Sequence, residues 1–325
     1  MITVRDIRRR IRSVEKISKI TQAMKTVAAI RLMKVQNQVL KQKPYALKIR
    51  EIVSDLVART PSLTHPMLGH GNKPEQTDVK IGKVNKEKRR IITALVLGSD
   101  RGLAGPFNNN LIAETQKFIE LNRGNDVRLI VVGKKLRDSL RARKHPIYLE
   151  LIGFYSQMTF SKVQNLAHGF LNEYMNGTID ELVAIYTEFR TTARQKVTTE
   201  QILPIGVSPA LPLKQTDKSG LSDIKKGGVN TISKKELFPS YIYEPDSFAV
   251  LDQILPMYYD REVWRIFLES TASEHMARMI AMDMATINGI NMIRHLTLVY
   301  NKARQESITR ELSEISTAAE AFRVR

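Results

Sequence analysis

The sequence predicts an α/β domain held between two long terminal helices that pair as an antiparallel coiled coil. Two observations predict this fold. Both ends of the 325-residue chain show helical repeats that are too long for a compact domain to bury, and the middle alternates apolar strand-like runs with shorter helical stretches. We therefore divide the chain into a first helix at 1–60, a central domain at 61–260 and a last helix at 261–325.

The first helix is predicted to begin at Thr3, which suits an N-cap and is followed three residues later by Asp6, as in a capping box. Pro44 should kink or end the helix, and a further helical stretch runs from Tyr45 to Val57. The whole would be about 80 Å long. Its apolar residues recur in steps of three or four, which predicts one stripe on one face: Ile7, Ile11, Val14, Ile17, Ile20, Met24, Val27 and Ile30.

The last helix is predicted from Glu262 to Phe322, where there is no proline and a single glycine, Gly289. An unbroken helix of this length would measure about 90 Å. Apolar residues recur along it, at Met276, Ile280, Ile287, Ile290, Ile293, Leu296, Val299 and Ala303. A heptad series then closes the chain: Ile308, Leu312, Ile315, Ala319 and Phe322.

Each terminal stripe needs a long partner, because a compact domain cannot cover a helix of this length. The economical arrangement pairs the two helices with each other, since they have similar length and lie at opposite ends of the chain. The alternative is two separate coiled-coil arms that dimerise with a second copy.

The middle of the chain predicts a small α/β domain. Apolar runs predict strands at Ile91–Leu97, Arg128–Val132, Leu182–Phe189 and Val197–Leu203. Helices are predicted between them at 107–121, Lys134–Arg143 and Lys162–Met175. Two polar segments are expected to form surface loops, His70–Arg90 and Pro212–Glu236, the second inside a basic low-complexity insertion at about 209–240.

Few residues suggest catalysis. The chain has no cysteine, its six histidines are scattered, and no catalytic triad or carboxylate pair stands out, so we expect no catalytic residue, metal or cofactor. The glycines of Gly98–Gly105 follow a strand and precede a helix, as in a phosphate-binding loop, but match neither nucleotide-binding pattern. The alternative is a tight turn that leaves Asp100 and Arg101 free for contacts at a protein surface.

The net charge of +18 is concentrated near the start: residues 1–50 contain 14 Lys/Arg and 2 Asp/Glu. Such a helix favours nucleic acid, an anionic membrane surface or an acidic protein. Its phosphate contacts to nucleic acid would be Arg8, Arg9, Arg10, Arg12, Lys16, Lys19 and Lys25. Residues 1–44 contain no aromatic side chain for base stacking, and the chain has no run of about 18 apolar residues that would span a membrane.

Three stretches together resemble the gamma subunits of F-type ATP synthases. The first comprises Ile7–Ile11, Ile17–Met24 and Val27–Ala29, and the second is Gly98–Leu103 with Phe107 and Asn108. The third comprises Ser273–His275, Arg278–Met279, Ala281–Asp283, Ala285–Thr286, Leu298–Asn301, Arg304–Gln305, Ile308–Thr309 and Glu311–Leu312.

The resemblance implies a Rossmann-like central domain at the foot of an antiparallel coiled coil. The chain would be the non-catalytic central rotor shaft, with alpha, beta, epsilon and c subunits as partners and delta possibly in the same complex. It would transmit torque from an ion-driven c ring to the alpha/beta ring without binding nucleic acid. We expect a peripheral position on the cytoplasmic face of a bacterial inner membrane, because the start of the chain lacks a leader-like segment.

The resemblance also implies roles for particular residues. Polar contacts to beta would come from Arg304, Gln305, Thr309 and Glu311, and the basic residues Arg8, Arg9 and Lys16 would face an acidic loop of beta. Met24 and Arg278 align with a coupling region, although Met24 equally suits plain coiled-coil packing. Asp100, Arg101 and Gly102 would form a turn in the foot, and Ile315–Phe322 would run in an apolar bearing. The rival readings are a nucleic-acid-binding basic coiled-coil protein and an α/β enzyme that binds nucleotide near Gly98–Gly105.

Overall fold

A computed structural model describes residues 3–59, 65–69, 89–191, 194–206 and 243–323. Apart from Arg89 and Arg90, the two predicted surface loops lie outside the described residues. The long helices are α1 (Val4–Arg59) and α5 (Ser247–Arg323), and the two short 3-10 helices are η1 (Pro66–Leu68) and η2 (Phe154–Gln157). The α/β body contains β1 (Ile91–Leu97), α2 (Phe107–Leu121), β2 (Asp126–Val132), α3 (Lys134–Ala142), β3 (Ile147–Leu151), α4 (Phe160–Met175), β4 (Glu181–Thr191) and β5 (Arg194–Leu203).

The body is built on a five-stranded sheet with the order β3-β2-β1-β4-β5. The pairs β3–β2, β2–β1 and β1–β4 are parallel, whereas β5 runs antiparallel to β4. The strand order reverses between β1 and β4, as in doubly wound folds, which confirms the predicted Rossmann-like domain. The central strand β1 is buried almost along its whole length because helices cover both faces, as its continuous apolar run predicts.

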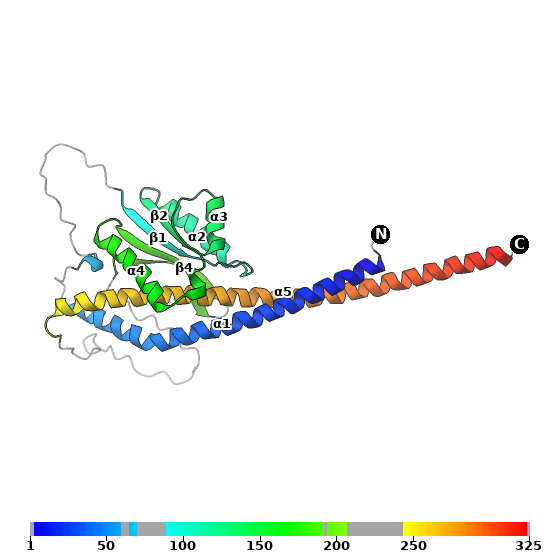
Figure 1. The fold of residues 1–325 in the computed structure, drawn as a ribbon, viewed down its shortest axis with the longest axis horizontal. Helices are drawn as coiled ribbons and strands as arrows, with labels where there is room; N and C mark the ends of the chain where they lie inside the picture. The colour runs from blue at the N-terminus through cyan, green and yellow to red at the C-terminus, as the bar shows by residue number, and fades with distance from the viewer. Residues whose placement is uncertain (1–2, 60–64, 70–88, 192–193, 207–242, 324–325) are drawn as a thin grey trace, which may run out of the picture.

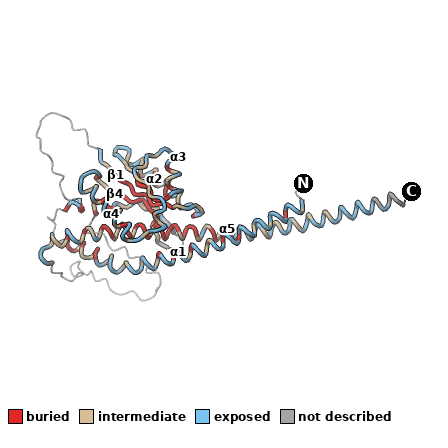
Figure 2. Tube along the Cα trace, viewed as in Figure 1, coloured by how far each residue is buried: buried red, intermediate tan, exposed pale blue. Residues whose placement is uncertain are grey.

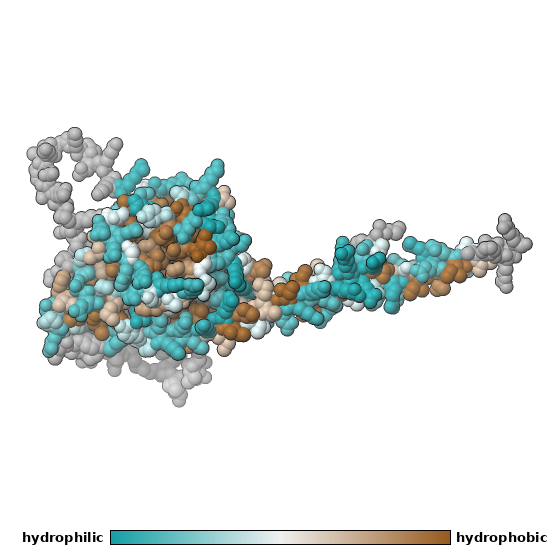
Figure 3. Space-filling model, viewed as in Figure 1, coloured by the Kyte–Doolittle hydropathy of each residue, from teal (hydrophilic) through white to brown (hydrophobic). Residues whose placement is uncertain are grey.

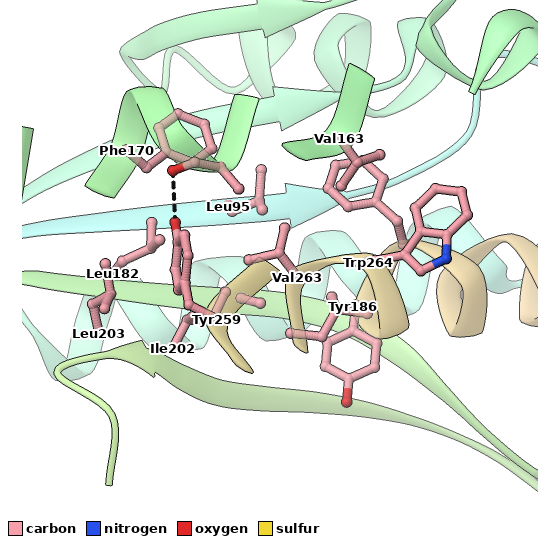
Figure 4. Close-up of a cluster of buried hydrophobic side chains, with 14 of the residues drawn as sticks. Leu95, Val163, Phe170, Leu182, Tyr186, Ile202, Leu203, Tyr259, Val263 and Trp264 are labelled. Atoms are coloured by element: carbon pink, nitrogen blue, oxygen red, sulfur yellow. Dashed lines mark hydrogen bonds between the residues drawn. The ribbon is translucent and has the colours of Figure 1, made fainter. Parts of the chain in front are cut away.

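Two apolar cores lie on opposite faces of the sheet. One joins the sheet to α4, the first part of α5 and the second half of α1, and the other joins it to α2 and α3. Figure 4 shows part of the first core, where Tyr259 of α5 donates its hydroxyl hydrogen bond to the Ala167 carbonyl of α4 at 2.9 Å. Figure 2 shows that burial follows the sheet and the body segment of α5 and fades along the projecting helices. The first part of α5 therefore belongs to the core of the body, and the same helix continues beyond the body beside α1.

The terminal helices pair with each other in antiparallel orientation, as predicted. Both chain termini lie toward the same end of the molecule, far from the body (Figure 1). Thr21 contacts Thr286 and Lys25 contacts Asp283, so the residue number falls along one helix as it rises along the other. The long partner that each stripe requires is thus supplied within the chain.

Both long helices pass through a proline. Of the two alternatives predicted at Pro44, a kink or an end, the structure excludes an end, because α1 continues through this exposed residue to Arg59. The last helix begins at Ser247, earlier than the predicted start near residue 261, and passes through Pro256. In both cases packing outweighs the loss of one backbone hydrogen bond, because buried residues of the helix lie on either side of each proline.

Candidate functional site: the shaft and its joint with the body

The seam between α1 and α5 follows a heptad of alternating four- and three-residue steps. In its middle, small or polar side chains replace large apolar ones. The Thr21 and Thr286 hydroxyls lie 2.7 Å apart, and Lys25 Nζ lies 2.6 Å from Asp283 Oδ1. The buried residues of α1 on this seam are Ile7, Ser18, Thr21, Ala28, Leu32 and Val35. A seam of this kind lets the two helices approach closely and fixes their register through polar pairs.

The predicted single stripe on the first helix is wrong beyond Val14. Ile17, Ile20, Val27 and Ile30 point outward, each about half exposed or more. In a helix of 3.6 residues per turn, residues three apart fall short of a full turn, so a series of such steps drifts away from the seam. Alternating steps of four and three stay on the seam. The middle of the shaft therefore presents apolar side chains on its outer surface, visible as brown patches between teal ones in Figure 3.

The basic residues predicted to contact a partner lie on the outer surface of α1. Arg8, Arg9 and Lys16 are all exposed. Met24 is partly buried, which fits a residue at the flank of the seam. Arg8, Arg9 and Lys16 thus give the first turns of α1 a positive surface.

The last part of α5 projects beyond its partner helix. The register set by the Thr21–Thr286 contact puts Val4 of α1 about level with Ala303, so the remainder of α5 stands alone, as Figure 1 shows. The predicted contact residues here are all exposed: Arg304, Gln305, Thr309 and Glu311. The closing heptad is exposed too, at Ile308, Leu312 and Ile315. Within the described residues this stripe has no partner helix, contrary to the expectation that the heptad marks coiled-coil pairing.

The turn after β1 lies at the carboxyl edge of the sheet, where the strand order reverses. Asp100 is not free for surface contacts, because its Oδ1 accepts hydrogen bonds from the backbone N–H groups of Lys134 at 3.0 Å and Gly153 at 3.1 Å. It thereby ties the turn to the N-terminus of α3 and to the turn that follows β3. The Arg101 side chain is exposed, as expected for a residue available to a partner.

One glycine in this turn and one in the turn after β2 allow close packing between the two turns. A Cβ atom added to Gly98 would lie 2.5 Å from Leu136 Cβ, and one added to Gly133 would lie 2.7 Å from the Ser99 backbone. Asp100 Oδ1 also accepts a hydrogen bond from the backbone N–H of Lys134 at the N-terminus of α3. The segment is therefore a strand-to-helix turn packed against α3, as the alternative to a phosphate-binding loop predicts.

Arg278 is buried inside the joint between this turn and α5. Its Nη2 donates to Glu274 Oε1 at 2.7 Å, and only 9% of the Arg278 side chain and 8% of the Glu274 side chain are exposed. The same nitrogen lies 3.4 Å from the carbonyl oxygens of Arg101 and Gly102. Sequence reasoning omitted Glu274, although its position four residues before Arg278 on a helix is a signal for an ion pair.

Burial of this joint changes two pKa values. Desolvation raises the pKa of Glu274, although the neighbouring Arg278 guanidinium opposes the shift. Burial, followed by the positive charges of Arg278 and Arg31, lowers the pKa of His275 to about 4. The neutral form of His275 therefore predominates in the folded protein near pH 7.

We expect His275→Gln to reduce the acid sensitivity of the fold. The folded-state pKa lies below the ordinary value of 6.5, so the unfolded chain binds more protons and stability is lost as pH falls from about 6.5 to about 4. After a discount for partial exposure, the loss is about 1–2 kcal/mol. The measurement is urea unfolding at several pH values, with His295→Gln, an exposed position on the same helix, as control. Equal pH slopes for His275→Gln and the unmodified chain would contradict the assignment.

In the parts of the chain that the structure describes, no group of three or more histidine or acidic side chains is arranged to hold a metal ion. Among those same residues, no helix combines the length and the apolar character needed to cross a membrane.

Comparisons with known proteins match almost the whole chain. A family model described as ATP synthase matches residues 3–322. The chain is 36% identical to the ATP synthase gamma chain of Anaeromyxobacter dehalogenans (strain 2CP-C), over 99% of this chain and 100% of that protein. It is 36% identical to the ATP synthase gamma chain of Heliobacterium modesticaldum, over 98% and 99% of the two chains.

Solved structures share the fold. One is a chain of the rotor of the Euglena gracilis mitochondrial ATP synthase, with a TM-score of 0.55 and 18% identity, covering 94% of this chain and 98% of that one. Another belongs to the central stalk and c-ring of the Tetrahymena thermophila mitochondrial ATP synthase, with a TM-score of 0.53 and 19% identity, covering 82% and 99%. With the near full-length match to curated relatives, the chain belongs to the ATP synthase gamma chain family.

Proposed function

We propose that this chain is the central rotor shaft of an F-type ATP synthase and that it contains no catalytic site of its own. The observation that carries the proposal is the asymmetric shaft: two helices of unequal length wind around each other, and one continues alone. At 1.5 Å per residue the 77 residues of α5 span about 115 Å, long enough to reach from a basal body deep into a ring of subunits.

The asymmetry supplies the mechanism. A ring of three alpha and three beta subunits around this shaft meets a different surface on each side: the apolar residues of mid-α1, the basic residues near its start, or the single helix at the end of α5. Each surface stabilises a different conformation of the beta subunit beside it, so rotation shifts the populations in turn. Two wound helices also resist twisting better than one.

Particular residues have proposed roles in these contacts. The positive surface around Arg8, Arg9 and Lys16 suits an acidic loop of beta. The free end of α5 offers exposed polar groups to beta at Arg304, Gln305, Thr309 and Glu311. Met24 serves the seam and its flank, while the burial of Arg278 favours a role inside the chain over a direct partner contact.

The α/β body is the proposed foot. It would contact the epsilon subunit and the ring of c subunits, with delta elsewhere in the complex, and would hold the chain peripherally at the membrane. We infer the cytoplasmic face of a bacterial inner membrane. The support is the relationship to bacterial gamma chains and the shared fold with rotor and central-stalk chains of solved ATP synthases.

Reconstitution with alpha and beta subunits of the same organism tests the proposal. We expect one copy of this chain per hexameric ring and a raised, sustained ATPase rate. The variant Arg304→Ala/Gln305→Ala should fold and assemble normally, because both side chains are exposed. It should lose most of the gain in ATPase rate, because it removes two of the polar groups proposed to contact beta.

Two outcomes would contradict parts of this proposal. Unchanged ATPase activity of the double variant in the assembled complex would remove the role given to this pair. Failure of well-folded subunits to form any complex would remove the shaft mechanism and return attention to the basic helix. In that case duplex DNA binding that survives moderate salt would favour the nucleic-acid alternative.

A further inference from the structure

The body and the shaft are joined where the carboxyl end of β1 meets α5. Ser270 Oγ donates to the Leu97 carbonyl at 3.1 Å, and both residues are buried. Three turns further along α5, a Cβ atom placed on Gly105 would lie 3.6 Å from Ala281 Cβ, so the loop backbone packs directly on the helix. Between these two points lies the buried Arg278, facing the carbonyl oxygens of Arg101 and Gly102.

The loop at this joint is stiffened from the body side. Asp100 holds the backbone of Lys134 and Gly153, which links the loop to the two neighbouring strand ends. Ser99 donates its hydroxyl to the Arg101 carbonyl at 2.8 Å, and Asn108 Nδ2 donates to Ser99 Oγ at 2.8 Å. A force applied to the sheet is therefore transmitted to this loop with little local bending.

The ion pair completes the joint from the shaft side. Glu274 lies one turn before Arg278 and fixes the direction of its guanidinium through a 2.7 Å hydrogen bond. A buried ion pair contributes little to net stability because both charges lose their hydration, so the contacts of this pair with the loop suggest a geometric role. Loss of Glu274 would remove the buried carboxylate that holds the guanidinium against the loop carbonyls.

We propose that Glu274 and Arg278 are positioning residues that hold the strand-end loop of the α/β body against the shaft at one angle, so that torque applied to the body turns α5 with little elastic twist. This inference rests on the proposed rotor function. It assigns the two residues to torque transfer inside the chain rather than to partner binding.

The test replaces the pair with apolar residues of similar length, Glu274→Leu/Arg278→Met. Such replacements of buried ion pairs often leave stability unchanged, but this one removes the hydrogen bonds to the loop. The chain has no cysteine, so Arg123→Cys, an exposed position after α2, gives a single attachment point for a bead on the body. With the alpha/beta ring fixed to a surface, the angular variance of the bead during the wait for ATP reports the stiffness between ring and body.

We expect the urea midpoint of the double variant to stay near that of the unmodified chain. Its angular variance should rise by about two-fold, because the guanidinium no longer holds the loop against α5. If the Glu274→Leu/Arg278→Met variant does not fold, Glu274→Gln/Arg278→Gln, a neutral pair of similar size, is tested in its place.

The matched control is Arg141→Gln/Glu150→Gln, which removes an ion pair between α3 and β3 inside the body, with its nitrogen and oxygen 2.7 Å apart. It should leave the bead variance unchanged. If the joint variant has the angular variance of the unmodified chain, or a raised variance only together with a lowered urea midpoint, the inference is overturned. An unmodified chain that fails to assemble or rotate refutes the rotor proposal itself.

Discussion

Replacing Gly133 with alanine is expected to lower the free energy of unfolding by about 3–5 kcal/mol, through backbone strain combined with overpacking. Gly133 has φ 105° and ψ 132° at the N-terminus of α3, a conformation that L-residues rarely adopt. The new Cβ would also lie 2.7–2.8 Å from the N, C and O atoms of Ser99. These are backbone atoms of a residue held by Arg101 and Asn108, so they cannot move aside cheaply.

Gly124→Ala is the matched control. The added Cβ would meet no atom within 4 Å, and the position has no positive φ, so the change in stability should stay within about 0.5 kcal/mol. Urea unfolding followed by circular dichroism compares the two variants. Equal stability for both would mean that the turn around Ser99 is looser than its hydrogen bonds indicate.

Much of the fold can be predicted from the sequence, because the strongest patterns belong to the most buried elements. The strand β1 reads as an apolar run since helices cover both of its faces. The long terminal helices can be recognised by the length of their helical repeats. Only pairing with each other covers apolar stripes of that length. The strand-to-helix turn at Gly98 was also placed correctly, because glycines between a strand and a helix mark a tight connection.

The elements that the sequence does not reveal are those with weaker burial. The strand β3 (Ile147–Leu151) was missed: it lies at the sheet edge, no residue in it is fully buried, and the residue before it is a proline. The seam of the shaft was misplaced for a related reason. Ser18 and Thr21 pack against α5, and a search for apolar repeats passes over them in favour of the exposed Ile17 and Ile20.

The joint illustrates the limit for the site. The i,i+4 pair of Glu274 and Arg278 is readable on a helix, but its partners Arg101 and Gly102 come from far along the chain. Spacing alone cannot bring them together, because their proximity depends on how α5 crosses the sheet. Exposed residues such as Arg304 were correctly expected on the surface, and their partner contacts remain predictions.

The other large effect is expected for Phe267→Ala, which should lower the free energy of unfolding by about 3–5 kcal/mol because it leaves a cavity in the main core. Phe267 is fully buried in α5 and packs against Phe154 and Tyr155, with ring centroids 5.3 and 6.5 Å away. Phe248→Ala removes a ring of the same size from the same helix, but Phe248 is 52% exposed, so it should cost less than about 1 kcal/mol. Urea unfolding measures both. A similar small loss for the two variants would mean that the body does not depend on α5 for its core; a large difference would mean that the helix that transmits torque also holds the sheet, so the body cannot separate from the shaft without unfolding.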